Sequence, residues 1–526
     1  MAQTLKREEL TGARRERVAG WAAGFAGLVA AAVALAVTEL LSALDPVPSL
    51  VIAIGDRIVD LVPPIVRDIA IAALGTADKP VLLVGIAVVS LAFGWVLGLL
   101  ARRALLLGVA GLAAFAVLGV VAAADDPRAS LVGAVISGLV GAATGALVLH
   151  RLLARAPHAR PRGERSGSTQ DGGTRRGFLR GAGAFLGLAV AGVFGGRFFR
   201  QTRQVSATRG ELVLPQVADP LPPPPDAASL EIDGLAPLFT PNEQFYRIDT
   251  ALSVPQVDIT NWELRVSGMV DREVTLSFDD LLGMEQVERD ITIACVSNEV
   301  GGGLVGNARW QGVPLTALLD RAGVSDAATQ IVGRSVDGFT VGFPTARARD
   351  GREALVAVAM NGEPLPAEHG YPARLVVAGL YGYVSATKWL SEIELTTLDA
   401  FDAYWVPRGW SKQAPIKTQS RIDVPGGGTI PAGETVVAGV AWAPTRGITK
   451  VEVQVDDGAW AEAELAEDFD DDVWRQWRWT WAATAGTHTL RVRATDGEGE
   501  TQTDERVPPR PDGATGYHTV QVSVGS

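Results

Sequence analysis

The sequence predicts an α-helical membrane region, followed by a mixed α+β domain and a C-terminal β-sandwich. Three observations predict this order: long apolar runs in the first 200 residues, a proline-rich stretch near residue 220, and short alternating strands after it. The chain has 526 residues, of which 47% are hydrophobic, and a mean hydropathy of +0.18. This is too apolar for an ordinary soluble enzyme, so part of the chain is expected to lie in lipid.

Four apolar segments have about the length that a helix needs to cross a bilayer, and we predict that all four are transmembrane helices: 21–41, 81–100, 104–124 and 131–149. Gly141 and Gly145 lie four residues apart in the fourth, a spacing that lets helices approach closely. Residues 51–74 carry several charges and two adjacent prolines, so this stretch should lie at the surface and not cross the membrane.

Arginine clusters predict the orientation of these helices, because cytoplasmic ends of membrane spans collect Lys and Arg. Acidic loops holding Asp45 and the pair Asp125 and Asp126 alternate with the basic clusters. Both ends of the four-helix block should therefore face the cytoplasm. The clusters are Arg14, Arg15 and Arg17; Arg102 and Arg103; and the arginines between Arg151 and Arg180.

The string TRRGFLR at residues 174–180, followed by the uncharged stretch 181–196, resembles a twin-arginine export signal. The alternative is that Arg175 and Arg176 are the cytoplasmic charges of a fifth helix. Either interpretation places everything after about residue 200 outside the cytoplasm and gives residues 1–200 about five transmembrane helices. Residues 205–207, VSA, imitate a signal-peptidase site but lie far beyond the apolar run, so the anchor is expected to stay.

Composition changes divide the rest of the chain. A proline-rich linker, 201–225, precedes a predicted α+β domain at 226–425 that includes a helix at 314–322. Residues 426–526 read as an immunoglobulin-like sandwich, because short strands are separated by turn signals. The predicted strands are 435–442, 448–455, 474–481, 487–495 and 517–524.

Charge and cysteine content exclude several classes of function. The formal net charge is −12 and neither half reads as a nucleic-acid binder. The single cysteine, Cys295, excludes an intramolecular disulfide, a CxxC redox pair, a cysteine-ligated iron–sulfur cluster and a CxxCH haem attachment. One thiol can still be one metal ligand, although a lone cysteine is most often a buried structural residue.

Four strings, in order, resemble the sulfite oxidase family of molybdopterin enzymes: ITIACVSNEVGG from residue 291, NARWQGVPLTALLDRAGV from 307, HGYPARLVVAGLYGYVSATKWLSEIEL from 369, and PIKTQSRID from 415. The likeness runs from about residue 240 to the C-terminus. It implies a mixed α+β cofactor domain, a molybdenum-pterin cofactor, and a sandwich that often serves as a dimerisation module, so a homodimer is expected. It also implies oxygen-atom transfer to or from a small oxo-substrate.

The resemblance assigns roles to individual residues. Cys295 aligns with the molybdenum ligand, and a soft, negatively charged thiolate suits that metal. Arg247 aligns with an arginine that meets the substrate anion, with a structural salt bridge as its alternative role. The cofactor contacts implied by the alignment are Tyr246, Ser335, His369, Arg374, Ser385 and Lys388. For His369 the alternative is an ordinary loop residue, and for Lys388 it is a solvated strand charge.

Three departures from the family pattern concern the substrate. Sulfite-oxidising members have R-N-H where this chain has Arg247-Ile248-Asp249, and basic residues where it has VSNE at 296–299. Val358 stands where those members hold a tyrosine near the metal. Because two expected cations are missing, the sequence favours a less charged sulfoxide or another oxo-acceptor over sulfite.

Electrons must enter or leave singly through a partner. Of the five histidines only His150 lies at the end of a membrane helix, so no bis-histidine haem is predicted in this chain. A separate cytochrome or quinone-linked protein is therefore expected, with the helices as a docking site. One alternative function is a membrane-bound scaffold on a degenerate cofactor fold. A transporter is a weaker alternative, because the spans lack the polar residues of a substrate path.

Overall fold

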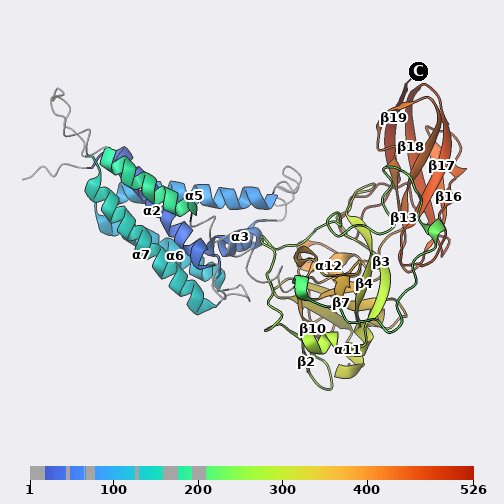
Figure 1. The fold of residues 1–526 in the computed structure, drawn as a ribbon, viewed down its shortest axis with the longest axis horizontal. Coiled ribbons are helices and arrows are strands. Elements are labelled where there is room, and N and C mark those ends of the chain that lie inside the picture. The colour runs from blue at the N-terminus through green and yellow to red at the C-terminus, as the bar shows by residue number, and fades with distance from the viewer. Residues whose placement is uncertain are drawn as a thin grey trace, which may run out of the picture. The chain divides into compact units, whose positions relative to one another are not determined.

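A computed structural model describes residues 18–42, 48–63, 66, 78–124, 130–157, 176–191 and 209–525. The chain forms two compact units (Figure 1). The first consists of Met1–Arg203 with Ala251–Ser253, and the second of Gln204–Thr250 with Val254–Ser526. Within the export string, Thr174 and Arg175 lie outside the described residues, as do residues 205–207, while a helix begins at residue 176 and runs to 191.

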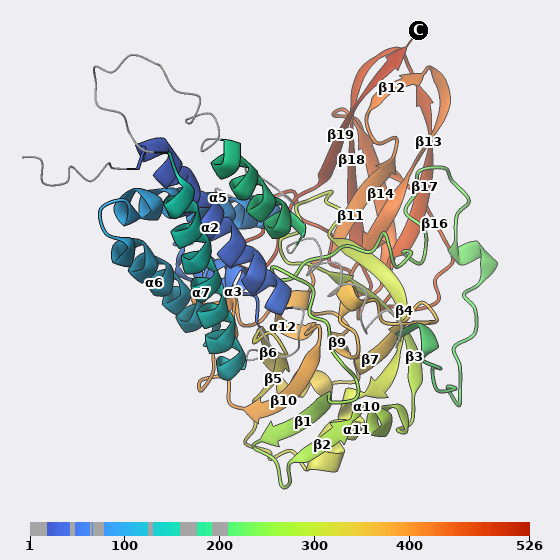
Figure 2. The same cartoon turned by 60° about the vertical axis from the view of Figure 1, so that its left-hand side comes forward.

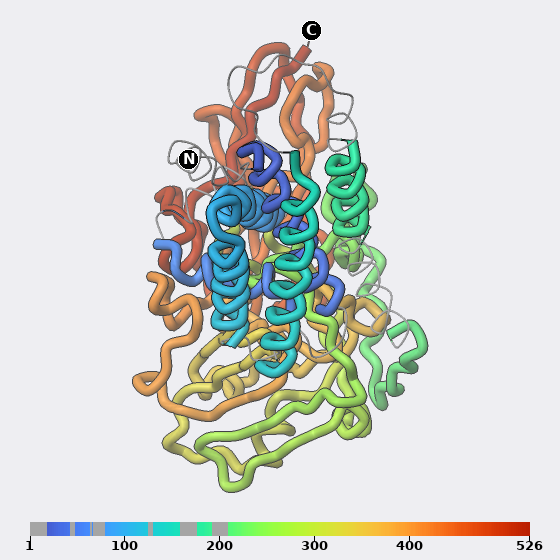
Figure 3. The backbone as a smooth tube through the Cα atoms, turned by 90° about the vertical axis from the view of Figure 1, so that its left-hand side faces the viewer, coloured from blue at the N-terminus to red at the C-terminus, as the bar shows by residue number. Residues whose placement is uncertain are grey.

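The first unit is helical (Figure 3), and four of its helices are long and apolar enough to cross a membrane. The prediction of four spans is therefore supported by helix length and composition. A shorter helix, α3, has 12 residues and is about 18 Å long, too short to cross, in line with the surface position expected for residues 51–74. The helices are α2 (Gly20–Leu41), α3 (Leu50–Leu61), α5 (Asp78–Ala101), α6 (Leu105–Ala123) and α7 (Leu131–Arg155).

Small residues let α7 pack closely against α2. A methyl group added at Gly141 would lie 2.7 Å from Cγ2 of Thr38, and one at Gly145 would lie 3.1 Å from Cβ of Ala34. Larger side chains would push the two helices apart. The glycine spacing noted in the sequence thus lies at the contact between these helices.

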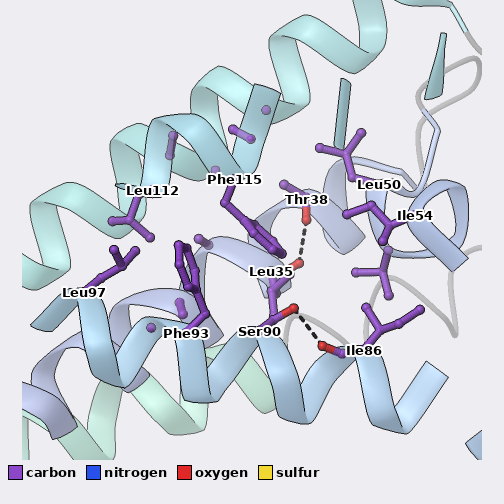
Figure 4. A pocket seen from close by; sticks show the side chains of 18 residues that line it. Leu35, Thr38, Leu50, Ile54, Ile86, Ser90, Phe93, Leu97, Leu112 and Phe115 are labelled. Atoms are coloured by element: carbon purple, nitrogen blue, oxygen red, sulfur yellow. Dashed lines mark hydrogen bonds between the residues drawn. The ribbon is translucent and has the colours of Figure 1, made fainter. Parts of the chain in front are cut away.

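An apolar cavity of about 50 Å³ lies among α2, α3, α5, α6 and α7 (Figure 4). Its wall includes Leu35, Phe93 and Phe115. The two hydroxyl groups on the wall are already satisfied, because Thr38 donates to the carbonyl of Leu35 (2.8 Å) and Ser90 to that of Ile86 (2.7 Å). The cavity therefore offers a ligand dispersion contacts and few polar ones.

In the second unit the proline-rich stretch is held against a sheet. Arg309 donates to the carbonyls of Leu221 (3.2 Å) and Pro222 (3.0 Å), and Gln311 donates to that of Pro215 (2.8 Å). The amide of Leu221 in turn donates to a carboxylate oxygen of Glu288 (2.9 Å). Residues 215–222 are thus bound to the strands that carry Glu288, Arg309 and Gln311, and this part of the predicted linker is not a free spacer.

Two sheets form the region predicted as an α+β domain (Figure 1). One is mixed, in the order β2-β1-β10-β5-β6, with β1 and β10 parallel; the other has the order β3-β4-β7-β8, with β9 paired to β7. The strands are β1 (Glu263–Gly268), β2 (Val274–Ser277), β3 (Val287–Ala294), β4 (Val305–Pro314), β5 (Gln330–Ser335), β6 (Thr340–Pro344), β7 (Ala354–Met360), β8 (Glu363–Pro364), β9 (Arg374–Val377) and β10 (Leu390–Thr396). The helices are η2 (Asp226–Ala228), α10 (Phe278–Leu282), α11 (Leu315–Ala322), η3 (Thr345–Ala348), η4 (Ala367–His369), α12 (Gly382–Ser385) and η5 (Val406–Arg408).

The helix α11 shows how local sequence determines these elements. Leu315, Leu318, Leu319 and Ala322 recur at helical spacing, and all four are buried. Gly323 ends the helix in a left-handed conformation, with a φ of 71°. The predicted helix at 314–322 is confirmed within one residue.

Two further sheets pack around one core at the C-terminal end (Figure 2), and its buried members come from both sheets. The five predicted strands are all present, and the immunoglobulin-like topology stays a prediction. The first strand, β11, lies before the predicted boundary at residue 425 and pairs with β13. The strands are β11 (Gln419–Val424), β12 (Gly428–Pro431), β13 (Gly433–Trp442), β14 (Ile448–Val455), β15 (Ala461–Glu462), β16 (Glu464–Leu465), β17 (Arg475–Ala483), β18 (Gly486–Asp496) and β19 (His518–Gly525).

Candidate active site

Cys295 follows β3 directly, at the point where that strand leaves its sheet. Its side chain is buried, its amide donates to the carbonyl of Leu304 (2.9 Å), and its Sγ lies 2.9 Å from Oγ of Ser297. Burial raises the pKa of the thiol, while the Ser297 hydrogen bonds and the charge of Lys388 oppose this rise. Ser297 and Lys388 therefore stabilise the thiolate, the form that binds metals.

Lys388 reaches the same site from the loop before β10. Its Nζ lies 3.2 Å from a carboxylate oxygen of Asp249 and donates to the carbonyl of Glu368 (2.9 Å). The same Asp249 oxygen accepts from Nε of Arg247 (2.9 Å). Burial lowers the pKa of Lys388 to about 8, and Asp249 opposes this change. Lys388 is thus no solvated strand charge, and Arg247 makes the salt bridge that was its alternative role.

His369 and Arg374 lie at the two ends of the HGYPAR segment, and both are buried. Nη1 of Arg374 donates to the carbonyl of His369 (3.1 Å), and its guanidinium lies 4.9 Å from the ring of Trp310. Burial lowers the pKa of Arg374 to about 10, so the group is still a cation at neutral pH. Burial, with the charge of Arg374, lowers the pKa of His369 to about 4, so its ring is neutral.

A tight turn brings these two segments together. Gly370 has a φ of 112°, and a methyl group added there would lie 3.0 Å from Cα of Lys388. Trp389 has a φ of 50°, unusual for a bulky side chain, and its indole donates to the carbonyl of Ala367 (2.7 Å). Residues held in rare backbone conformations cluster at functional sites, because the surrounding packing must enforce them.

Three further residues are predicted to contact the cofactor: Tyr246, Ser385 and Ser335. Tyr246 precedes Arg247, and burial together with Cys295 raises the pKa of its phenol while Arg374 opposes the rise. Ser385 ends α12, and its hydroxyl donates to the carbonyls of Leu380 and Tyr381, which precede that helix. Ser335 ends β5 and pairs with Leu390, the first residue of β10, two residues after Lys388.

The polar groups of this cluster fit an anionic, hydrogen-bonding cofactor. Nε2 of His369 lies 3.0 Å from the carbonyl of Asn242; since a carbonyl only accepts, Nε2 carries the proton and Nδ1 is an acceptor. Among the described residues, Nδ1 of His369 and Nε of Arg374 have no hydrogen-bond partner, although both are buried. Arg374 also forms no ion pair within the described part of the chain. Such a cation is costly to bury unless a ligand supplies the anion.

Several residues near the site could not be assigned from sequence. Tyr381, which precedes α12, interacts electrostatically with Cys295, and burial raises the pKa of its phenol to about 12. Val358, which the resemblance aligns with a tyrosine, lies in the hydrophobic core of the domain. Two further arginines of the domain are already paired, Arg309 with Asp290 and Arg334 with Glu394.

A cavity of about 240 Å³ lies beside α12, and Cys295 is not among its lining residues. It has several cations, but each has a carboxylate partner: Arg352 pairs with Asp350, Lys412 with Asp402, and Arg446 with Asp496. The positive charge of the wall is therefore largely neutralised. The cluster around Cys295, in which a donor of Arg374 and an acceptor of His369 have no partner among the described residues, is the stronger candidate for a ligand site.

The sequence of the region that carries most of this cluster is similar to that of known proteins. Residues 251–405 match the family described as "Oxidoreductase molybdopterin binding domain". Mitochondrial sulfite oxidase of Rattus norvegicus is 31% identical over 271 residues, which is 43% of this chain and 49% of that protein. The "uncharacterized oxidoreductase YuiH" of Bacillus subtilis is 35% identical over 153 residues, 29% of this chain and 74% of that protein.

A solved structure, the sulfane dehydrogenase SoxCD from Paracoccus pantotrophus, aligns with a TM-score of 0.48 and 23% identity over 56% of this chain and 82% of that one. The chain spans about half the length of the sulfite oxidases that it matches. The family profile and the sulfite oxidase relatives indicate a molybdopterin cofactor. The chain belongs to the sulfite oxidase family of molybdopterin-dependent oxidoreductases.

Proposed function

We propose that this protein is a membrane-anchored molybdenum oxidoreductase that transfers an oxygen atom to or from a small oxo-substrate, in a reaction of the sulfite-oxidation or sulfoxide-reduction type. Its catalytic domain would lie outside the cytoplasm, and a separate carrier would exchange electrons with it. The observation that carries this proposal is the buried Arg374, a cation without a carboxylate partner among the described residues, in the same cluster as the only thiol.

Arg374 and His369 would bind the polar end of the cofactor. The free Nε–H of Arg374 can donate to a phosphate oxygen, and Nδ1 of His369 can accept from an N–H group of the pterin. Tyr246, Ser335 and Ser385 would complete the walls of the site, as the family alignment implies. Because these groups are already oriented by the fold, little ordering is needed when the cofactor binds.

Cys295 would be the metal ligand supplied by the protein. When bound, the cofactor supplies a metal that changes oxidation state and exchanges an oxo group with the substrate. Burial raises the pKa of the Cys295 thiol, and the Ser297 hydrogen bond and the charge of Lys388 oppose this rise, so both groups would favour the thiolate when a metal binds. Arg247, whose side chain is 42% exposed, would meet a substrate that arrives from solvent.

Membrane anchoring would keep the enzyme close to its electron partner. Four helices have the required length and hydropathy, and the arginine clusters favour a cytoplasmic position for the loops that carry them. A cytochrome or a quinone-linked protein would accept or supply the electrons one at a time. The helical unit would be the docking site of that partner, with its exposed apolar side chains facing lipid or the partner's own spans.

The test is metal analysis together with the substitution Cys295→Ser. Purified wild type from a cofactor-competent host should contain about one molybdenum and one pterin per chain. The variant should lose turnover while its thermal unfolding changes little, because serine replaces cysteine with almost the same volume. Full activity of Cys295→Ser would refute the ligand assignment. Wild type that folds but holds no molybdenum would instead indicate a scaffold built on a degenerate cofactor fold.

A further inference from the structure

One carboxylate neutralises both cations that stand beside the candidate metal ligand. The same Oδ2 atom of Asp249 lies 2.9 Å from Nε of Arg247 and 3.2 Å from Nζ of Lys388. The side chains of Asp249 and Lys388 are only 5% and 11% exposed. Solvent therefore screens this contact weakly, and it should persist at physiological ionic strength.

The position of this trio relates it to the reacting atoms. Lys388 donates to the carbonyl of Glu368, the neighbour of His369 (2.9 Å), and Arg247 follows Tyr246 directly, so the trio lies among the predicted cofactor contacts. Two cations and one carboxylate leave the trio with a net charge of +1, where the cations alone would give +2. Charge this close to a buried site changes the binding of a charged substrate strongly and that of a neutral one weakly.

An incoming anion has to compete with Asp249. To bind Arg247 and Lys388 together, it would have to displace a carboxylate that already holds both, or approach with that carboxylate beside it. Like charges placed together in a poorly hydrated site are costly. A neutral oxo-substrate meets no such cost, because it needs only a hydrogen-bond donor.

We propose that Asp249 is a specificity-determining residue, which keeps the positive charge of the site low and so disfavours anionic oxo-substrates relative to neutral sulfoxides. This inference rests on the proposed function, because it concerns the substrate class of the same site. Asp249 already neutralises part of the charge of Arg247 before a substrate arrives. Substrate choice then follows from one carboxylate and not from the number of arginines.

The experiment compares Asp249→Asn and Asp249→Ser with wild type in the full, molybdenum-loaded protein. Both substitutions remove the charge, and Asn nearly preserves the shape. Sulfate binding is measured by calorimetry, which requires no turnover, and Michaelis constants are measured for sulfite and for dimethyl sulfoxide with artificial electron carriers. We expect the sulfate dissociation constant and the sulfite Michaelis constant to fall about tenfold, and the dimethyl sulfoxide constant to change less than about twofold.

Two controls separate this effect from general changes in charge or fold. Asp249→Glu retains the charge and should bind sulfate as weakly as wild type. Asp326→Asn removes a charge from an exposed position between α11 and β5 and should change nothing. If sulfate binds both neutral variants as weakly as wild type, the inference is wrong. If sulfate binding responds as expected but neither substrate is turned over, the proposed reaction fails while the role of Asp249 in setting the charge of the site stands.

Discussion

Asp472 shows, at the scale of a single residue, how burial couples stability to pH. Its carboxyl group is buried, and Oδ1 has no hydrogen-bond partner among the described residues. Burial, with Asp470 nearby, raises the pKa of Asp472 to about 7. In the unfolded chain the same group has a pKa of about 3.9. The folded protein therefore binds this proton more tightly than the unfolded chain does.

We predict a corresponding dependence of stability on pH. The contribution of Asp472 is fully present below about pH 4 and is lost as the pH rises through about 7, a change of up to roughly 4 kcal/mol. In Asp472→Asn the side chain is neutral at every pH, so the variant should unfold at higher denaturant concentration than wild type above pH 7. The two proteins should converge near pH 4. Chemical denaturation of both proteins from pH 4 to pH 8 measures this, and parallel curves would contradict it.

The roles of some site residues could be predicted from sequence and those of others could not. Cys295, His369, Arg374 and Lys388 stand in strings that resemble the family, and the structure gathers them into one cluster. The bridge formed by Asp249 joins positions 139 residues apart in sequence. Such a contact follows from how two loops fold against each other, which no local pattern specifies.

At the scale of elements, the agreement follows the distribution of apolar residues. The four long helices are continuous apolar runs and α11 has apolar residues at helical spacing, so the sequence located all five. The short strands β12, β15 and β16 have two to four residues each and were not predicted. A two-residue strand shows no period, so only its pairing with a neighbour identifies it.

The export segment provides a prediction at the same scale. Arg176 begins the helix at 176–191, and Arg175 precedes the described residues of that helix. Changing Arg175 and Arg176 together to lysine preserves the charge, so a helix oriented only by positive charge should still insert correctly. A twin-arginine signal should fail, and reporter fusions after residue 210 should lose their activity outside the cytoplasm. Unchanged export would leave the plain membrane anchor as the explanation.

At the scale of the whole second unit, the C-terminal sheets help to hold the loop that carries Cys295. Nη1 of Arg421, on β11, donates to the carbonyl of Gly302 (3.0 Å), and its Nε donates to Asp423 (2.6 Å). Nδ1 of His518, on β19, accepts from the amide of Ile422 (2.9 Å) and fixes the same strand. The C-terminal sheets therefore help to position the loop of the candidate metal ligand as well as adding a core of their own.

The last prediction tests this role of the sandwich. In Arg421→Gln the loop loses a charge-assisted hydrogen bond, worth about 1.5–3 kcal/mol, and Asp423 loses the cation that it pairs with. We expect amide hydrogen exchange to become faster at Cys295 and Leu304, whose backbone groups bond to each other across this loop, while the rest of the domain keeps its protection. Arg478→Gln is the matched control, because Arg478 pairs with Glu464 at an exposed position of the same sandwich and should leave the loop unchanged. Equal exchange rates in the two variants would show that the loop is held by its own domain alone, through bonds such as that from the amide of Leu304 to Asn298.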